Sequence, residues 1–131
     1  MPSFGTSSRR RLSECDERIQ TVMNEVVREF DCSILEGHRN EERQNEMFRT
    51  GKSHLKWPKG KHNTDPSRAV DVAPYPIDWN DRERFTLFAG YVLGIASTFG
   101  VKLRWGGDWN GDWQVRDNTF DDLPHFELAD E

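Results

Sequence analysis

Cysteine is scarce in this sequence, with only Cys15 and Cys32 among 131 residues. Two cysteines cannot form the several disulfides that staple small extracellular domains, and neither has a second cysteine at the spacing of a zinc site. Cys15 falls among the apolar positions of an expected helix, and Cys32 opens an expected strand. We therefore predict two buried thiols that behave as small apolar side chains.

Long apolar runs and an excess of positive charge are also missing. Residues 1–6 contain no apolar segment of signal-peptide length, and no stretch approaches a membrane span. The formal net charge of −5 argues against nucleic acid as a partner. The basic run at 9–11 is short and is expected to be a solvated helix end. The sequence thus predicts a protein made in the cytoplasm without a signal peptide, with no membrane insertion and no nucleic-acid partner.

Repeats, linkers and low-complexity segments are absent as well. A chain of this length predicts one domain, covering 1–131. Charged residues make up 31% of the chain, but five tryptophans and eight phenylalanines supply large apolar surfaces for a core. We therefore expect a folded domain and not a disordered one.

Apolar spacing predicts three helices, over 12–30, 40–49 and 80–99. Their expected N-caps are Ser7 or Ser8, Asn40, and Asn80 or Asp81. Short apolar runs predict four strands, over 32–36, 69–73, 101–105 and 125–128. Polar loops separate them, and the one over 52–66 is long enough to suggest a functional role. Short, few strands beside helices favour an α+β domain with a small antiparallel sheet.

Three polar residues that are far apart in the sequence have the types that a catalytic zinc ion needs. His62 precedes a turn, Asp71 lies inside the apolar run 69–73, and His125 begins the last expected strand. Two imidazoles and one carboxylate leave a tetrahedral ion one open position for water. Asp122 lies three residues before His125, where a second carboxylate could reach that position.

Each of these residues also has an ordinary structural interpretation. His62 fits a surface loop, Asp71 fits an ion pair with an arginine, and His125 fits a neutral core histidine. The position of Asp71 is the hardest to explain in this way, because a carboxylate inside an apolar run must be paired or bound to a metal. Alternation places Glu127 on the same strand face as His125, where it would either orient the imidazole or stay solvated. Solvation is the simpler expectation.

Three segments together carry a resemblance to a known family. They are the run 53–76, the sequence Leu-Arg-Trp-Gly-Gly-Asp-Trp at 103–109 and the sequence Asp-Leu-Pro-His-Phe-Glu-Leu at 122–128. They resemble the zinc peptidases that cut peptidoglycan stem peptides, the D-alanyl-D-alanine carboxypeptidases and L-alanyl-D-glutamate endopeptidases, whose fold is shared with hedgehog signalling domains. The chain looks most similar to small phage endolysins of the L-alanyl-D-glutamate type, and the resemblance spans residues 4–128.

The resemblance implies a role for five residues. It implies that Zn²⁺ is bound by His62, Asp71 and His125. It also implies that Asp122 is the general acid–base and that Arg39 polarises the scissile carbonyl. His62 and Asp71 are nine residues apart, against seven in the family's common form, and a turn insertion at 65–67 explains the difference.

Some assignments stay open at this point. Asp121 competes with Asp122 for proton transfer, and position in the motif favours Asp122. Gln44 could face the cleft, although solvent is the plainer expectation. Core packing and the substrate groove are equal alternatives for Trp105. The other residues that are candidates for lining the groove are Asp108, Trp109 and Trp113.

The resemblance implies a monomeric zinc endopeptidase that hydrolyses the L-Ala–D-Glu bond of peptidoglycan stem peptides. Such a protein would serve a phage as an endolysin and act on the host cell wall after release. One alternative is a D-alanyl-D-alanine carboxypeptidase on the same scaffold. Another is a non-catalytic zinc module that binds cell wall or a protein partner. Asp122 argues against the second alternative, because a binding module needs no acid beside its metal.

Overall fold

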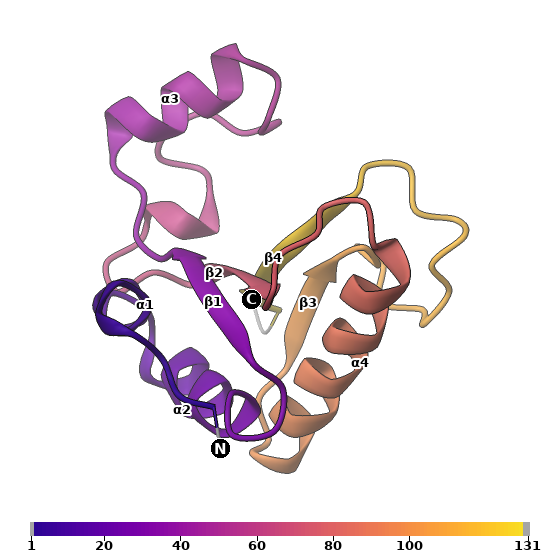
Figure 1. Ribbon diagram of the computed structural model, residues 1–131. Helices are drawn as coiled ribbons and strands as arrows, with labels where there is room; N and C mark the ends of the chain where they lie inside the picture. Colours follow the sequence, from indigo (N-terminus) through magenta and orange to yellow (C-terminus); the bar gives the residue numbers. More distant parts are fainter. Residues whose placement is uncertain (1, 130–131) are drawn as a thin grey trace.

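The computed structural model describes residues 2–129 and combines helices with one small sheet (Figure 1). The elements, in chain order, are α1 (Thr6–Leu12), α2 (Glu17–Val26), β1 (Cys32–Glu36), α3 (Glu41–Arg49), the 3-10 helix η1 (Lys61–Asn63), β2 (Ala69–Pro74), α4 (Arg82–Thr98), β3 (Leu103–Gly106) and β4 (Asp122–Leu128). The strands form one antiparallel sheet in the order β1-β2-β4-β3. The predicted α+β class is confirmed, with four α-helices where about three were expected.

The sheet has one apolar face and one polar face. In the register of β2 and β4, Val70 lies opposite Phe126, and Asp71 lies opposite His125. Successive side chains of a strand point to opposite faces, so these two pairs point in opposite directions. Val70 and Phe126 are completely buried in the core. On that side α4 packs against β2, β3 and β4 and against α2, which leaves the other face of the sheet for the polar pair.

The first predicted helix is wrong in its extent, because residues 12–30 form the end of α1, a turn, α2 and a second turn after Val26. The turn is held by a distant residue, Ser67. The Asp16 amide donates to the Ser67 carbonyl, and the Ser67 amide donates to the Glu14 carbonyl, both at 2.8 Å. Asp16 then caps α2 by accepting a hydrogen bond from the Arg18 amide. Apolar spacing continues across the break, so periodicity alone could not reveal it.

The remaining element boundaries lie close to their predicted positions. Asn40 and Asp81 cap α3 and α4 through their side-chain oxygens, as predicted. The predicted serine cap of α1 is wrong: α1 begins at Thr6, and the Ser8 hydroxyl instead accepts a hydrogen bond from the amide of Ile34. β3 begins two residues later than predicted and β4 three residues earlier.

Both cysteines are free and buried, as predicted. Cys32 opens β1, whereas Cys15 lies in the turn between α1 and α2 and not within a helix. Burial raises the pKa of each thiol to about 12, so neither is ionised near neutral pH. These positions fit the predicted role of small apolar side chains.

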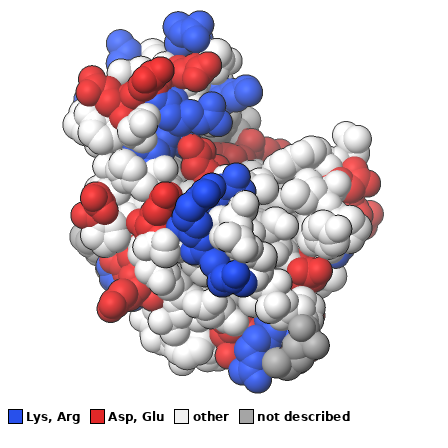
Figure 2. Space-filling model, turned by 60° about the vertical axis from the view of Figure 1, so that its left-hand side comes forward, with Lys and Arg blue, Asp and Glu red and all other residues white. Residues whose placement is uncertain are grey.

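Two segments extend beyond the sheet at the same end of the molecule (Figure 1). The first, called the α3 wall here, comprises α3 and residues 50–61. The second, called the loop wall, comprises residues 107–121. Figure 2 shows that the lobe containing α3 carries charges of both signs on its outside. Its exposed charged residues are Glu41, Glu42, Arg43, Glu46, Arg49, Lys52, Lys56 and Lys59. Within residues 2–129, no helix combines the length and the apolar character needed to cross a membrane.

Candidate metal centre

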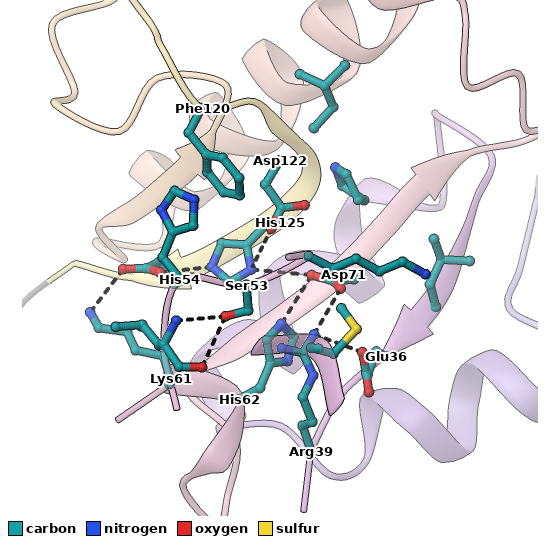
Figure 3. Close-up of a pocket in the computed structure, with 18 of the residues that line it drawn as sticks. Glu36, Arg39, Ser53, His54, Lys61, His62, Asp71, Phe120, Asp122 and His125 are labelled. Carbon is teal, nitrogen blue, oxygen red and sulfur yellow. Dashed lines mark hydrogen bonds and ion pairs between the residues drawn. The ribbon is translucent and has the colours of Figure 1, made fainter. Parts of the chain in front are cut away.

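Three side chains from separate elements converge on the polar face of the sheet (Figure 3). His62 lies in η1, Asp71 in β2 and His125 in β4. Asp71 Oδ1 lies 3.1 Å from His62 Nε2 and 3.3 Å from His125 Nδ1. The three ligand atoms lie within 4.8 Å of one another, close enough to hold one metal ion. The three residues singled out in the sequence therefore form a candidate metal site.

The far nitrogen of each imidazole has a partner of its own. His62 Nδ1 lies 2.7 Å from the carbonyl oxygen of Gly37, which can only accept, so Nδ1 carries the hydrogen and donates. His125 Nε2 donates in the same way to the Glu127 carboxylate at 2.8 Å. In its neutral form each ring turns a lone pair toward Asp71. Three electron-pair donors that face one point attract a cation, either a proton or a metal ion, and this donor set fits zinc.

The charges around the site favour that cation. Burial acts to raise the pKa of Asp71, but the two imidazoles outweigh it and hold that pKa well below its usual range. Burial acts to lower the pKa of His125, yet hydrogen bonds to Asp71 and Glu127 outweigh it and raise that pKa to about 10. The site thus holds positive charge strongly, and a metal ion would replace a proton there.

The candidate metal site lies in a cleft of about 930 Å³ between the two walls. The α3 wall contributes Gln44 and His54 to its lining, and the loop wall contributes Trp109 and Phe120. The His54 and Phe120 rings come from opposite walls, and their centroids lie 4.1 Å apart. Figure 3 shows these two rings beside His125. A cleft of this size falls within the roughly 300–1,000 Å³ that small-ligand sites occupy.

Asp122 and Asp121 are neighbours in the chain but differ in their surroundings. Asp122 Oδ2 lies 3.9 Å from His125 Nδ1, and its side chain is 34% exposed. Burial raises the pKa of Asp122, and the nearby Asp71 carboxylate raises it further. Asp121 instead pairs with Arg82, and hydrogen bonding to that arginine lowers the pKa of Asp121. Asp122 is therefore the carboxylate that faces the metal site with a raised proton affinity.

Arg39 lies beside the metal site and not on the surface, with 6% of its area exposed. Its Nη2 lies 2.8 Å from Glu36 Oε1 and 3.6 Å from Asp71 Oδ2 (Figure 3). Its Nη1 donates to Gln44 Oε1 at 3.0 Å. Among residues 2–129, its buried Nε has no hydrogen-bond partner. The guanidinium is thus held at the cleft by contacts of its two terminal nitrogens.

Two polar residues that were expected to face solvent are buried next to the site. Gln44 is 1% exposed, and Glu127 is 8% exposed, so both solvent expectations are wrong. Glu127 accepts the His125 hydrogen bond and is flanked by Lys61 and Arg104. The strand alternation signalled the position of Glu127 correctly, but the two cations that stabilise its burial come from η1 and β3.

Only one of the four candidate groove residues lines the cleft. Trp109 does so, with its ring centroid 5.3 Å from that of His125. Trp105 is 3% exposed within the core, where its Nε1 donates to the Leu123 carbonyl. Asp108 is buried inside the loop wall and accepts a hydrogen bond from the Trp113 amide, while the Trp113 side chain is 70% exposed. Asp108, Asp112 and Asp117 lie together in that wall, away from the cleft.

Comparisons with known proteins agree with one another. A family model described as phage L-alanyl-D-glutamate peptidase matches residues 2–129. The L-alanyl-D-glutamate peptidase of Escherichia phage T5 is 34% identical over 136 aligned positions, which cover 96% of this chain and 97% of that protein. The crystal structure of the Serratia marcescens L-Ala D-Glu endopeptidase ChiX superimposes with a TM-score of 0.77 and 27% identity, covering 98% of this chain and 91% of that one.

The match extends over almost the whole chain and includes every residue of the candidate metal site. The similarity to the phage T5 peptidase covers both proteins almost completely, so it is not confined to a shared motif. The sequence resemblance, the family model and the fold all lead to one conclusion. The chain belongs to the family of phage L-alanyl-D-glutamate peptidases.

Proposed function

We propose that this chain is a zinc-dependent endopeptidase that hydrolyses the L-Ala–D-Glu bond of peptidoglycan stem peptides. The observation that carries the proposal is the convergence of His62, Asp71 and His125 in a cleft that Asp122 also faces. Family membership supports the choice of bond and substrate. A phage protein of this activity would act as an endolysin on the host cell wall after release.

In this proposal Zn²⁺ is held by His62 Nε2, the Asp71 carboxylate and His125 Nδ1. Zinc in such a site supplies a Lewis acid that makes water reactive near neutral pH. Gly37 and Glu127 fix the ring orientations from behind, since each accepts the hydrogen of the far nitrogen. These hydrogen bonds therefore orient the two imidazole nitrogens for metal binding.

Asp122 is the proposed general acid–base. Its carboxylate takes a proton from the attacking water and later gives it to the leaving amine of D-Glu. The raised pKa of Asp122, caused by burial and by the Asp71 carboxylate, suits a group that must both accept and release a proton. Asp121 is unsuited to this task, because it is bound to Arg82 and Asn118.

Arg39 is the proposed stabiliser of the developing oxyanion. Glu36, Asp71 and Gln44 surround its terminal nitrogens, so the guanidinium is oriented before substrate binds. A carbonyl oxygen in the cleft would be a suitable acceptor for a guanidinium hydrogen.

We test the proposal by digesting purified peptidoglycan and identifying the new termini by mass. Cleavage at L-Ala–D-Glu creates a new D-Glu amino terminus, whereas a D-alanyl-D-alanine carboxypeptidase would release free D-Ala. A protein that binds peptidoglycan without producing either would be a non-catalytic module. The proposal predicts the first outcome, and either of the others would overturn it.

Asp122→Ala and Asp121→Ala form a matched pair for the same assay. Asp122→Ala should lower turnover by roughly 10²–10⁴-fold, the usual contribution of a general acid–base, while keeping its metal. Asp121→Ala removes a carboxylate of the same type one residue away, and it should keep most of the activity. Equal losses in the two variants would remove Asp122 from its proposed role.

We further propose that the chain acts as a monomer. Every residue of the proposed site comes from one chain, so no second copy is required to complete it. Sedimentation at assay concentrations should give the mass of a single chain, and an active dimer would contradict this part of the proposal.

A further inference from the structure

Gln44 is an uncharged polar residue in the first half of α3, and its side chain is almost completely buried. Its Oε1 accepts from Arg39 Nη1 at 3.0 Å and from Asn63 Nδ2 at 3.1 Å. Its Nε2 donates to Ser53 Oγ at 3.1 Å and to the Leu55 carbonyl at 2.6 Å. A side-chain amide has two donor hydrogens and two acceptor lone pairs, so its whole capacity is used.

The orientation of this amide is set by its neighbours. Arg39 and the Asn63 amide nitrogen can only donate, and the Leu55 carbonyl can only accept. If the amide were flipped, donors would face donors and the Leu55 oxygen would face another oxygen. An unmatched buried polar group is destabilising, so the observed orientation is strongly preferred. The oxygen of Gln44 therefore always faces Arg39.

The Gln44 oxygen accepts the hydrogen bond from one of the two terminal nitrogens of Arg39. Glu36 holds Nη2, and Gln44 holds Nη1. Without Gln44, the guanidinium would keep its anionic neighbours but would be free to rotate around the Glu36 contact. Its main chain would stay in place, because the Arg39 amide donates to the His62 carbonyl and the Asn63 side chain donates to the Arg39 carbonyl. Removing Gln44 would thus change the orientation of the Arg39 side chain and leave its main chain in place.

We propose that Gln44 is a positioning residue that sets the orientation of Arg39 and ties it to the cleft lining at residues 53–55. This inference rests on the proposed function, in which Arg39 stabilises the oxyanion. The oxygen and the nitrogen of the Gln44 amide have different roles. Oε1 orients Arg39, whereas Nε2 holds the segment that carries His54, whose ring reaches Phe120 on the opposite wall. Substitutions that keep one end and remove the other can separate the two effects.

The central experiment is a double-mutant cycle of Gln44→Met with Arg39→Ala, measured as kcat and KM on a stem peptide. Methionine is close in shape to glutamine but offers neither amide group. Gln44→Met should lower kcat by roughly 10–100-fold, as loss of a supporting contact behind an active-site group typically does, with little change in KM or metal content. In the double variant this loss should vanish, because Arg39 is no longer there to be oriented. Full additivity would overturn the proposal.

Two further variants separate positioning from general support of the fold. Gln44→Glu keeps an oxygen for Arg39 but loses both donors, so it should restore most of kcat while its thermal midpoint falls. Asn45→Ala is the matched control: its side chain accepts from the Trp57 amide and ties α3 to the same loop without touching Arg39. It should leave kcat unchanged. A kcat loss in Gln44→Glu or Asn45→Ala as large as in Gln44→Met would mean that only stability is involved.

The orientation of Arg39 is also measured without any substrate. NMR signals of the Arg39 guanidinium N–H groups, assigned by their disappearance in Arg39→Lys, should be sharp in the wild type and broadened in Gln44→Met. If the wild-type protein cleaves no stem peptide, the proposed function fails while this test still stands. Unchanged guanidinium signals in Gln44→Met would overturn the positioning role, whatever the activity. If Gln44→Met does not fold, Gln44→Glu decides alone. Sharp guanidinium signals and a near-wild-type kcat would support the role of Oε1, because this variant loses only the donors at Nε2, whereas broadened signals with a large kcat loss would overturn it.

Discussion

The two walls of the cleft are built in different ways. The α3 wall is held by a buried network, in which Gln44 uses all four of its hydrogen-bonding positions and Arg39 lies between three partners. The loop wall is held by partly buried contacts. Asn118 Nδ2 donates to the Gly106 and Phe120 carbonyls, Trp109 Nε1 donates to the Phe120 carbonyl, and the Trp109 and Phe120 rings stack. Its Trp113 is largely exposed.

The difference indicates a division of labour between the walls. A buried network in which Gln44 uses its whole hydrogen-bonding capacity holds the Arg39 guanidinium in one arrangement, which is what a group that stabilises a transition state needs. Aromatic rings on a loop offer broad contact area and tolerate small shifts of the ligand. We therefore expect changes in the α3 wall to act on kcat and changes in the loop wall to act on KM. The sheet between them carries the metal ligands.

The largest effect should come from the polar face of the sheet, because the proposed metal site lies there. Without the metal, the residues of both walls have no reaction to support. Asp71→Ala removes the only carboxylate among the three proposed ligands and leaves the two imidazoles as the remaining ligands. Bound zinc should fall from one per chain to almost none, and hydrolysis should be lost with it. Elemental analysis of dialysed protein measures the metal. Full zinc occupancy in Asp71→Ala would contradict the ligand assignment.

The next largest effect should come from Arg39, whose guanidinium donates to Gln44 of the α3 wall. Arg39→Lys keeps the charge but loses the planar fork that reaches Glu36 and Gln44 together. Turnover should fall by roughly 10²–10³-fold, the usual cost of losing one oxyanion donor, and KM should change little. Initial-rate kinetics on a stem peptide separate the two constants. If KM rose while kcat stayed at the wild-type value, Arg39 would be a ground-state binding residue and the proposed contrast between the walls would be wrong.

A smaller effect is expected for Glu127, which lies behind the metal site on β4. Glu127→Gln keeps an oxygen for the His125 hydrogen bond but removes the charge that Lys61 and Arg104 neutralise. Zinc affinity or activity should fall by roughly 10–100-fold, as is typical for partners that orient a metal ligand. Zinc titration against a competing chelator measures the affinity. An unchanged affinity would show that the Gly37 and Asp71 contacts alone are enough to organise the imidazoles.

The smallest effect should come from the loop wall. Trp109→Ala removes a ring that lines the cleft and should raise KM by up to about tenfold, equivalent to about 1.4 kcal/mol of binding, with little change in kcat. Trp113→Ala removes a ring of the same type from the exposed side of the same loop, and both constants should stay at wild-type values. A kcat loss in Trp109→Ala comparable to that of Arg39→Lys would erase the distinction between the walls.

Local patterns predicted much of the scaffold. Asn40 and Asp81 cap their helices with side-chain oxygens, and β1 covers the predicted residues. These features depend on hydrogen bonds and dihedral preferences within a few residues, which sequence patterns describe well. The break between α1 and α2 was missed because it is held by Ser67, about 50 residues away. No local rule contains that contact.

The sequence predicted which residues belong to the candidate site better than it predicted how they are arranged in space. His62, Asp71 and His125 could be selected because their residue types suit one metal, and strand alternation placed Glu127 beside His125. Sequence alone could not choose physically between Asp121 and Asp122. The choice depends on Arg82, which lies 39 positions from Asp121 in the chain and pairs with it in the folded protein.

The sequence by itself determined the chemical identity of the proposed ligands, the faces of β2 and β4 and the family of the chain, because residue type, period-two alternation and motif matches are all local properties. Only the tertiary structure decided that Gln44 is buried against Arg39 and that Trp105 belongs to the core while Trp109 lines the cleft. The physical reason is that burial and hydrogen-bond partnership depend on which distant segments pack together, and these contacts form only when the whole chain folds.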